Sequence, residues 1–308
     1  MRIFECCLTE EQTGLMIKQV VASLHLSKRL RRAVTESGGV RLNDHMAYWT
    51  TRVTAGDVLT IDAPHEEGSA SIIPEDIPLV IAFEDEHVLV IDKPAGMVVH
   101  PTGTHTKSTL VSAVAYHLQG RQETGMCRPL HRLDRETSGL IVFAKHKLAH
   151  ERLVRALRAR QVTRAYIAYV HGLLPFAERL LELPILRPSE GKLQRAVAPY
   201  GKPAWTHVWR DTRYERAPIT KVRLRLLTGR THQIRVHMSH IGYPLIGDWL
   251  YGRTPDPWLD RQALHAGELR FAHPIDGRTI ELQADLPRDL KDLEARLQAG
   301  TKVDAQNK

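Results

Sequence analysis

Between residues 79 and 286 the sequence consists largely of short apolar or alternating segments, which is the pattern of β-strands. The predicted strands occupy residues 79–84, 87–92, 140–144, 164–170, 192–197, 204–210 and 220–227, followed by a hairpin that turns at Asp276 and Gly277. Helical spacing is confined to residues 108–118, residues 148–160 and a segment with Ile234, Met238 and Ile241 on one face. Many strands with few inserted helices predict an α+β domain with one large, mainly antiparallel sheet and flanking helices and loops.

A smaller unit precedes this domain, in residues 1–62. Apolar residues recur at helical spacing from Leu15 to Leu26, and Ser27 is placed to cap a second helix over residues 28–36. Two glycines then introduce short strands at residues 40–42 and 53–62, with turns at Asn43 and at Gly56. The pattern predicts a small domain of two helices and a hairpin.

The remaining boundaries follow from composition. Residues 63–78 combine prolines and a glycine with small and acidic residues, as linkers do. We therefore expect the large domain at residues 79–288 and a charged helical tail, fraying into polar residues, at 289–308.

Positive charge is concentrated in the middle of the chain. Residues 128–235 contain 23 Lys and Arg against 8 Asp and Glu, a net +15, so the rest of the chain carries −7 of the total +8. This asymmetry favours a polyanionic partner such as nucleic acid over a merely solvated basic face. The three cysteines form no paired framework, and neither a signal peptide nor a long apolar stretch is present. We therefore expect no membrane partner and a location in the cytoplasm.

One carboxylate stands within this basic region. Asp134 lies between Arg132 and Arg135 in the segment from His131 to Gly139. Arginines suit the holding of phosphates, while a carboxylate can do chemistry that cations cannot. Taken alone, the segment is better explained by surface salt bridges, and only the blocks around it favour catalysis.

Four blocks together carry a resemblance. They are residues 81–101, residues 131–140, residues 164–170 and residues 228–237, supported by residues 241–248 and 264–266. In this order and spacing, from about Leu79 to Leu286, the chain resembles the RluA-type family of RNA pseudouridine synthases. The resemblance implies isomerisation of uridine to pseudouridine in structured RNA, without cofactor or metal. The spacing of His232, His237 and His240 also does not favour a metal site.

The resemblance assigns three catalytic residues. Asp134 matches the family's catalytic aspartate, and Arg235 matches the arginine that keeps this carboxylate charged by a salt bridge. Tyr166 matches the tyrosine that stacks on a uracil flipped out of the RNA, and its hydroxyl is a candidate acceptor of the C5 proton. Tyr169, three residues further along the strand, points to the opposite face and is assigned to packing.

Further residues are predicted to contact or shape the substrate site. Arg132 matches the arginine that fills the place of the flipped base, and His131 is interpreted as a satisfied structural histidine. Lys93 is either a phosphate contact or a charge at the end of a strand. The predicted RNA-contacting set is His131, Arg132, Arg135, Thr137, Lys93 and Arg230. Arg164 departs from the family pattern, which usually has a lysine there.

The small domain loosely resembles the αL-type RNA-binding motif. Its predicted second helix carries four basic residues that could contact phosphates, namely Lys28, Arg29, Arg31 and Arg32. A domain that only caps the fold is the alternative. The small domain and linker favour large-subunit ribosomal RNA as substrate over transfer RNA, and we expect a monomer.

Two other classes of function compete with this interpretation. A non-catalytic RNA-binding assembly factor would not need Asp134, Tyr166 and Arg235 together. An Asp-dependent hydrolase would need a second acid with defined geometry, and only Glu136 is near in the sequence.

Overall fold

The strands of the large domain join in a single sheet that is built from two halves. The computed structural model describes residues 2–24, 26–64, 72–101, 107–120, 127–189 and 193–300. One half contains β5 (Val80–Glu84), β6 (Val88–Lys93) and β8 (Ser138–Ala144), with the short β7 (Arg128–Pro129) beside β8. The other contains β9 (Thr163–His171), β14 (Ile219–Leu226), β13 (Trp205–Tyr214) and β10 (Glu178–Glu182).

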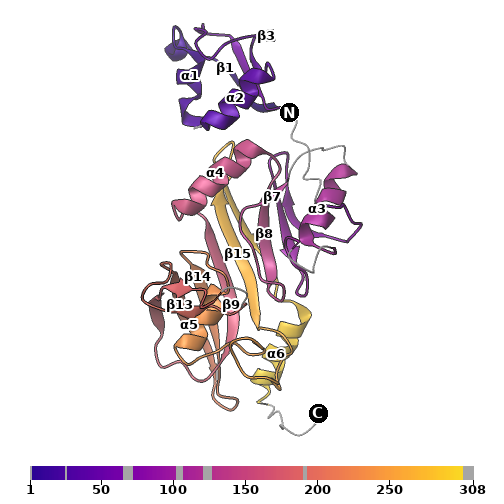
Figure 1. Cartoon of the computed structure of the whole chain (residues 1–308), viewed down its shortest axis with the longest axis vertical. Coiled ribbons are helices and arrows are strands. Elements are labelled where there is room, and N and C mark those ends of the chain that lie inside the picture. The colour runs from indigo at the N-terminus through magenta and orange to yellow at the C-terminus, as the bar shows by residue number, and fades with distance from the viewer. Residues whose placement is uncertain are drawn as a thin grey trace.

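Strand β15 (Leu264–Ala272) lies between the two halves and joins them (Figure 1). It is parallel to β8, whereas it runs antiparallel to β9 and to the following strand β16 (Thr279–Gln283). Gly139 on β8 has φ +110°, and a Cβ atom there would lie 2.3 Å from the carbonyl oxygen of Ala266. Only glycine therefore permits the close approach of β8 and β15. The prediction of one mainly antiparallel sheet is confirmed.

Helices cover the sheet where the sequence has capped apolar segments. Helix α3 (Leu110–Gln119) begins at Thr109, and α4 (Lys147–Arg158) begins at His146; each cap side chain accepts a backbone N–H of its helix. Helix α5 (Gln233–His240) follows β14 and contributes Ile234 and Met238 to the main core. A two-stranded ribbon, β11 (Ile185–Leu186) and β12 (Ala196–Val197), lies apart from the large sheet.

The expected charged tail contains a packed helix. Leu290, Leu293 and Leu297 of α6 (Arg288–Gln298) are buried against Tyr169 and Ile219 of the sheet. The large domain therefore extends beyond residue 288, to the end of this helix. The three leucines are three and four residues apart, which is the spacing of one helical face, but the charged residues between them obscure this pattern in the sequence. Residues 301–308 of the expected tail lie outside the described residues.

The small domain has its own sheet and core. Its strands are ordered β1 (Arg2–Cys7), β4 (Val58–Asp62), β2 (Val40–Leu42) and β3 (His45–Met46). Two short turns of 3-10 helix, Glu10–Gln12 and Val21–Leu24, and α1 (Ile17–Val20) precede α2 (Lys28–Glu36), whose predicted bounds and Ser27 cap are confirmed. The strand expected over residues 53–62 begins only at Val58, because the carboxylate of Asp57 accepts the N–H of Thr54 and closes a turn.

The small domain contacts the large one through α4 (Figure 1). Leu148 is buried in the core of the small domain, and the hydroxyl of Ser27 donates to Glu151 at 2.7 Å. The guanidinium of Arg152 donates to the carbonyl of Leu24 at 3.3 Å. Helix α4 therefore connects the small domain to the large one.

Part of the expected linker lies on the large domain. Residues 72–78 contain no helix or strand, and residues 65–71 lie outside the described residues, as does Lys192 of the strand expected at 192–197. The N–H of Glu75 donates to Ser112 of α3, and its carboxylate accepts the N–H of Ser108. No helix in the described ranges is long and apolar enough to cross a membrane.

Candidate active site

Asp134 lies on a loop that leads into β8 and is fixed from below by the turn after β6. The N–H of Gly96 donates to the carbonyl of Arg135 at 2.9 Å, and Thr137 donates its N–H to the carbonyl of Asp134 at 3.1 Å. The Asp134 loop is therefore closed by its own turn and attached to the turn after β6.

Lys93 contributes to this attachment from inside the protein. Its side chain is fully buried, and its ammonium donates to the carbonyls of Pro94, Met97 and Arg135 at 2.7, 2.9 and 3.0 Å. Burial lowers the pKa of Lys93 to about 7. Of the two roles considered for Lys93, the contacts favour the charge at the strand end, which holds the Asp134 loop, over a phosphate contact.

Asp134 and Arg235 lie side by side although 101 residues separate them. Nη1 of Arg235 donates to Oδ2 of Asp134 at 3.2 Å. The arginine side chain is 4% exposed and the aspartate side chain 17% exposed, so the pair faces solvent only through the carboxylate. Helix α5 supplies Arg235, whose side chain is buried.

A second carboxylate, Asp248, holds Arg235 from behind. It is fully buried and accepts Nε and Nη2 of Arg235 at 2.7 and 2.8 Å, in the bidentate geometry that arginine favours. It also accepts the N–H groups of Leu250 and Tyr251. Burial opposes the charge of Arg235, but the contacts with Asp248 and Asp134 outweigh it and raise the arginine's pKa. Sequence reasoning gave Asp248 no role, although it lies in one of the supporting blocks.

His232 and Tyr251 complete the surroundings of the carboxylate. Nε2 of His232 lies 4.0 Å from Oδ1 of Asp134, and its Nδ1 is 2.9 Å from the hydroxyl of Tyr251. The ring of Tyr251 lies 5.1 Å below the guanidinium carbon of Arg235. Burial lowers the pKa of His232, which favours the neutral imidazole. Its backbone has φ +56°, which directs the chain from the preceding loop into α5.

Tyr166 faces the same space from β9. It is 3% exposed, and burial raises the pKa of its hydroxyl, which therefore stays protonated at neutral pH. Tyr169 points to the other face and is fully buried against α6, as predicted. Asp134 comes from one half-sheet and Tyr166 from the other, so β15 sets their relative position.

Two adjoining cavities open beside these side chains. The inner cavity, of about 50 Å³, has walls from Asp134, Tyr166, His232, Arg235 and Leu264. The outer cavity, of about 450 Å³, lies between the Asp134 loop, the end of α4, the start of β9 and residues 226–231. Both cavities are lined by Asp134 and Tyr166, so these two side chains lie where the cavities meet.

The structure separates the other predicted RNA-contacting residues into exposed and buried ones. Arg132 and Arg230 are exposed and line both cavities. Arg135 is exposed but pairs with Glu136 at 3.1 Å. Thr137 is 2% exposed, and its hydroxyl accepts Nε2 of Gln262 at 3.3 Å, which gives it a role in holding the loop.

His131 differs from the expectation of a satisfied histidine. Both of its ring nitrogens are buried, and neither has a hydrogen-bond partner within the described part of the chain. Burial, and then the charge of Arg164, lowers the pKa of His131 to about 3, so the ring is neutral. The ring forms part of the wall of the outer cavity.

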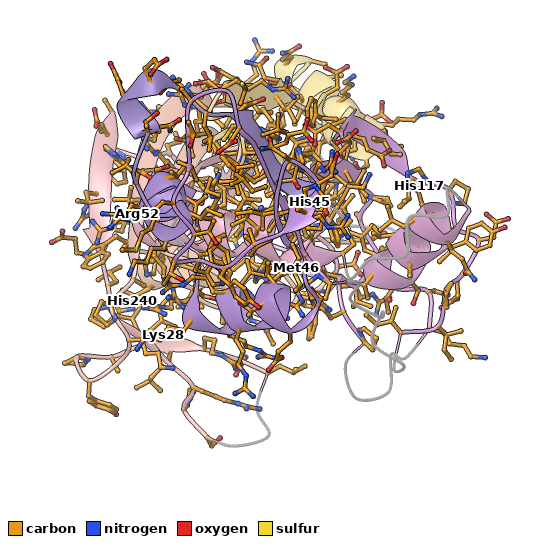
Figure 2. All side chains as sticks on the ribbon, turned by 90° about the horizontal axis from the view of Figure 1, so that it is seen from above. Lys28, His45, Met46, Arg52, His117 and His240 are labelled. Atoms are coloured by element: carbon orange, nitrogen blue, oxygen red, sulfur yellow. The ribbon has the colours of Figure 1, made fainter. Side chains whose placement is uncertain are left out.

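The basic residues of the small domain are far from this site in the chain and line neither cavity. All four lie exposed on α2, and Lys28 is visible there in the view from the small-domain end (Figure 2). A separate cavity of about 440 Å³ is lined by Lys28 and Arg31 of α2 and by Arg155 of α4. Among the described residues, no group of three or more His, Cys, Asp or Glu side chains is arranged to hold a metal ion.

Comparison with known proteins gives concordant results. A family model described as RNA pseudouridylate synthase matches residues 87–240. "Ribosomal large subunit pseudouridine synthase D" of Yersinia pestis is 41% identical over 314 residues, covering 96% of this chain and 94% of that protein. An uncharacterized RNA pseudouridine synthase of Bacillus subtilis (strain 168) is 39% identical, covering 95% of this chain and 96% of that protein. The solved structure of human RNA pseudouridylate synthase domain containing 1 is 28% identical with a TM-score of 0.56, covering 73% of this chain and 96% of that one.

Proposed function

Because this chain belongs to the RNA pseudouridine synthase family, and is thus an isomerase acting on RNA, we propose that Asp134 is its nucleophile and large-subunit ribosomal RNA its substrate. The observation that carries the catalytic assignment is the series of contacts from Asp134 to Arg235 to Asp248. It holds one partly exposed carboxylate at the junction of two cavities.

The reaction requires a rearrangement within a single nucleotide. The bond between uracil N1 and ribose C1′ breaks, the base turns, and a bond from C5 to C1′ forms. C5 then loses its proton and N1 gains one, so no other reactant is consumed. The target base must leave the RNA stack to reach the enzyme, at a cost of a few kcal/mol that new contacts offset.

Each group of the site has a role in one of these reaction steps. The carboxylate of Asp134 attacks the nucleoside, and Arg235 orients it through a charge-assisted hydrogen bond. Tyr166 stacks on the flipped uracil, and its hydroxyl takes part in removal of the C5 proton. Arg132, exposed at the rim of both cavities, fills the place that the base leaves in the RNA.

Two features support ribosomal RNA as the substrate. The relative from Yersinia pestis named for the large ribosomal subunit matches along nearly the whole chain, the small domain included. The small domain also presents four exposed basic residues on α2, which suit contacts with RNA phosphates outside the catalytic cavity. We place this activity in the cytoplasm.

Release of tritium from RNA labelled at uracil C5 tests the catalytic assignment. Asp134→Asn keeps the size of the side chain but removes the nucleophile, so tritium release should fall below detection while RNA affinity stays within about twofold of wild type. Release at the wild-type rate would remove Asp134 from the mechanism.

Pseudouridine mapping in total RNA from a deletion strain tests the substrate: a site lost from transfer RNA alone would contradict the ribosomal assignment.

A further inference from the structure

The outer cavity carries more positive charge than the catalytic carboxylate can balance. Its lining contains one acid, Asp134, and five arginines. The five are Arg132, Arg158, Arg160, Arg164 and Arg230. Asp134 is already paired with Arg235, which lies outside this lining. None of the five arginines forms an ion pair with an acid in the described part of the chain. The cavity therefore has a net charge of about +4 before any ligand binds, since Arg side chains are always protonated.

Arg164 gives the strongest indication of an anionic ligand, because this arginine is buried. It is 6% exposed, and its Nε has no hydrogen-bond partner in the described ranges. Its guanidinium lies against Gly229, where an added Cβ would be 3.2 Å from Nη1. A buried cation without a counter-ion is costly, unless a ligand supplies the missing negative charge.

Arg160 is held at the cavity by an aromatic side chain. It follows α4 with φ +60°, a left-handed conformation that is uncommon for a residue with a Cβ. Its guanidinium carbon lies 4.5 Å from the ring centre of Trp205 at the start of β13. The backbone of Trp205 is fixed in turn, because its N–H donates to the hydroxyl of Thr228 at 2.9 Å. A stacked guanidinium keeps its N–H edges free for an anion.

We propose that the outer cavity is a phosphate-binding site for the RNA strand, in which Arg164 and Arg160 bind a backbone phosphate next to the flipped uridine. Trp205 is a positioning residue that directs Arg160 toward this phosphate. The proposal rests on the proposed function, since it takes the inner cavity as the place of the uracil. Arg158 and Arg230, both exposed and both in the lining of the same cavity, extend the site along the strand.

Binding of RNA at different salt concentrations tests the site without any need for turnover. The probe is a large-subunit ribosomal RNA transcript. Arg160→Gln should weaken binding about tenfold and lower the slope of log affinity against log salt by about one. Trp205→Leu should also weaken binding, whereas Trp205→Phe, which keeps an aromatic ring under Arg160, should bind RNA as wild type does. Arg288→Gln is the control, because this arginine is 96% exposed on α6, outside the cavity lining.

A neutral linkage in the RNA identifies the phosphate itself. Single methylphosphonates are placed on either side of the modified uridine in a fragment that contains it. At one position the substitution should weaken binding to wild type but have no further effect on Arg160→Gln. Additive losses at every position, or an Arg160→Gln variant with wild-type affinity and salt slope, would overturn the proposal.

Two further measurements distinguish a loss of phosphate binding from a loss of folding or of turnover. Arg164→Lys keeps a charge that can be buried, so a folded variant with weakened binding is expected even if Arg164→Gln does not fold. Arg160→Gln should retain kcat within about twofold at saturating RNA while KM rises. Wild-type protein that forms no pseudouridine in any RNA would contradict the proposed function, whereas the binding results would still decide whether the phosphate site exists.

Discussion

Arg235 is shared between two carboxylates with different surroundings. Asp248 is fully buried and accepts two hydrogen bonds from it, whereas Asp134 accepts one and is partly exposed. Asp248 therefore fixes the guanidinium, and the remaining N–H edge of the arginine is left to orient the carboxylate of Asp134.

Removal of Asp248 should cost both stability and activity. Asp248→Ala leaves Arg235 buried with only Asp134 beside it, so we expect a loss of about 3–5 kcal/mol in unfolding free energy, measured by urea denaturation. Asp289→Ala is a matched control, because Asp289 also binds an arginine, Arg261, through two contacts but is 39% exposed. Its loss should be smaller. Equal losses for the two variants would contradict the role assigned to Asp248.

The contribution of the Tyr166 hydroxyl to the reaction can be measured separately from that of its ring. Tyr166→Phe keeps the stacking surface, so RNA affinity should stay within about twofold, while tritium release slows about a hundredfold through loss of the proton-handling group. Tyr169→Phe is the control, since Tyr169 is buried against α6 on the opposite face. Equal rates for Tyr166→Phe and wild type would exclude the hydroxyl from the reaction.

The sequence alone indicated the residues around the carboxylate better than the residues that support it. Asp134, Arg235 and Tyr166 stand in recognisable blocks, and the structure brings them to one recess. The burial of Lys93 and the pairing of Asp248 depend on contacts between distant loops, which residue spacing does not reveal. Arg160 gave no signal either, because its partner Trp205 is 45 residues away, on strand β13.

Helix α4 contacts both the small domain and the outer cavity. Its first turn contacts the small domain through Leu148 and Glu151, and its last residue, Arg158, lines the outer cavity. At its start, Nδ1 of His146 accepts the N–H of Ala149, and its Nε2 lies 3.0 Å from Nδ1 of His87. A helix that contacts both regions can relate the small domain to the catalytic recess.

The cap of α4 should make stability sensitive to acid. Burial, then the nearby His87, lowers the pKa of His146 to about 3. Below its ordinary pKa of about 6.5, the unfolded chain binds a proton that the folded chain does not, so unfolding becomes easier as pH falls. The expected change is about 1.4 kcal/mol per pH unit between about pH 6.5 and 3 from this residue.

Urea denaturation at pH 7 and 5.5 measures this effect. His146→Asn keeps an acceptor for the N–H of Ala149 and removes the proton, so the stability of the variant should depend less on pH. His45→Asn, at an exposed histidine of β3, is the control. The same pH dependence in wild type and His146→Asn would contradict this role for the cap.

Elements were predicted best where periodicity and caps agree. The second small-domain helix begins and ends as expected, and the strands of the large sheet lie within a few residues of their predicted bounds. Strand β1 was missed because its burial pattern contains one buried residue among exposed and half-buried ones, and the edge strand β10 because it is mostly exposed. The order of strands in the sheet follows from long-range pairing, which local pattern does not encode.

At the scale of the whole molecule, the small domain and α6 mark opposite ends of the long axis (Figure 1). If α2 grips RNA, replacing its four basic residues by Gln should weaken RNA binding and reduce the salt slope by about three, with kcat unchanged within about twofold. The replaced residues are Lys28, Arg29, Arg31 and Arg32. Filter binding at several salt concentrations and tritium release at saturating RNA measure the two effects.

The matched control removes the same charge from the other end. It replaces exposed residues near or on α6, which are Arg213, Arg216, Arg288 and Lys291. If both variants lose the same RNA affinity, α2 contributes only through the total charge of the protein. If neither variant loses affinity, the small domain is only a structural cap.

The position of β15 between the two half-sheets has a consequence during protein synthesis. Both halves can be translated before residues 264–272 exist, yet nothing then holds the aspartate-bearing half against the tyrosine-bearing half. A nascent chain emerging from the ribosome would carry two unpaired inner strand edges, the kind of surface that chaperones protect. The two halves of the site can therefore be brought together only in one late step, after β15 itself has been translated.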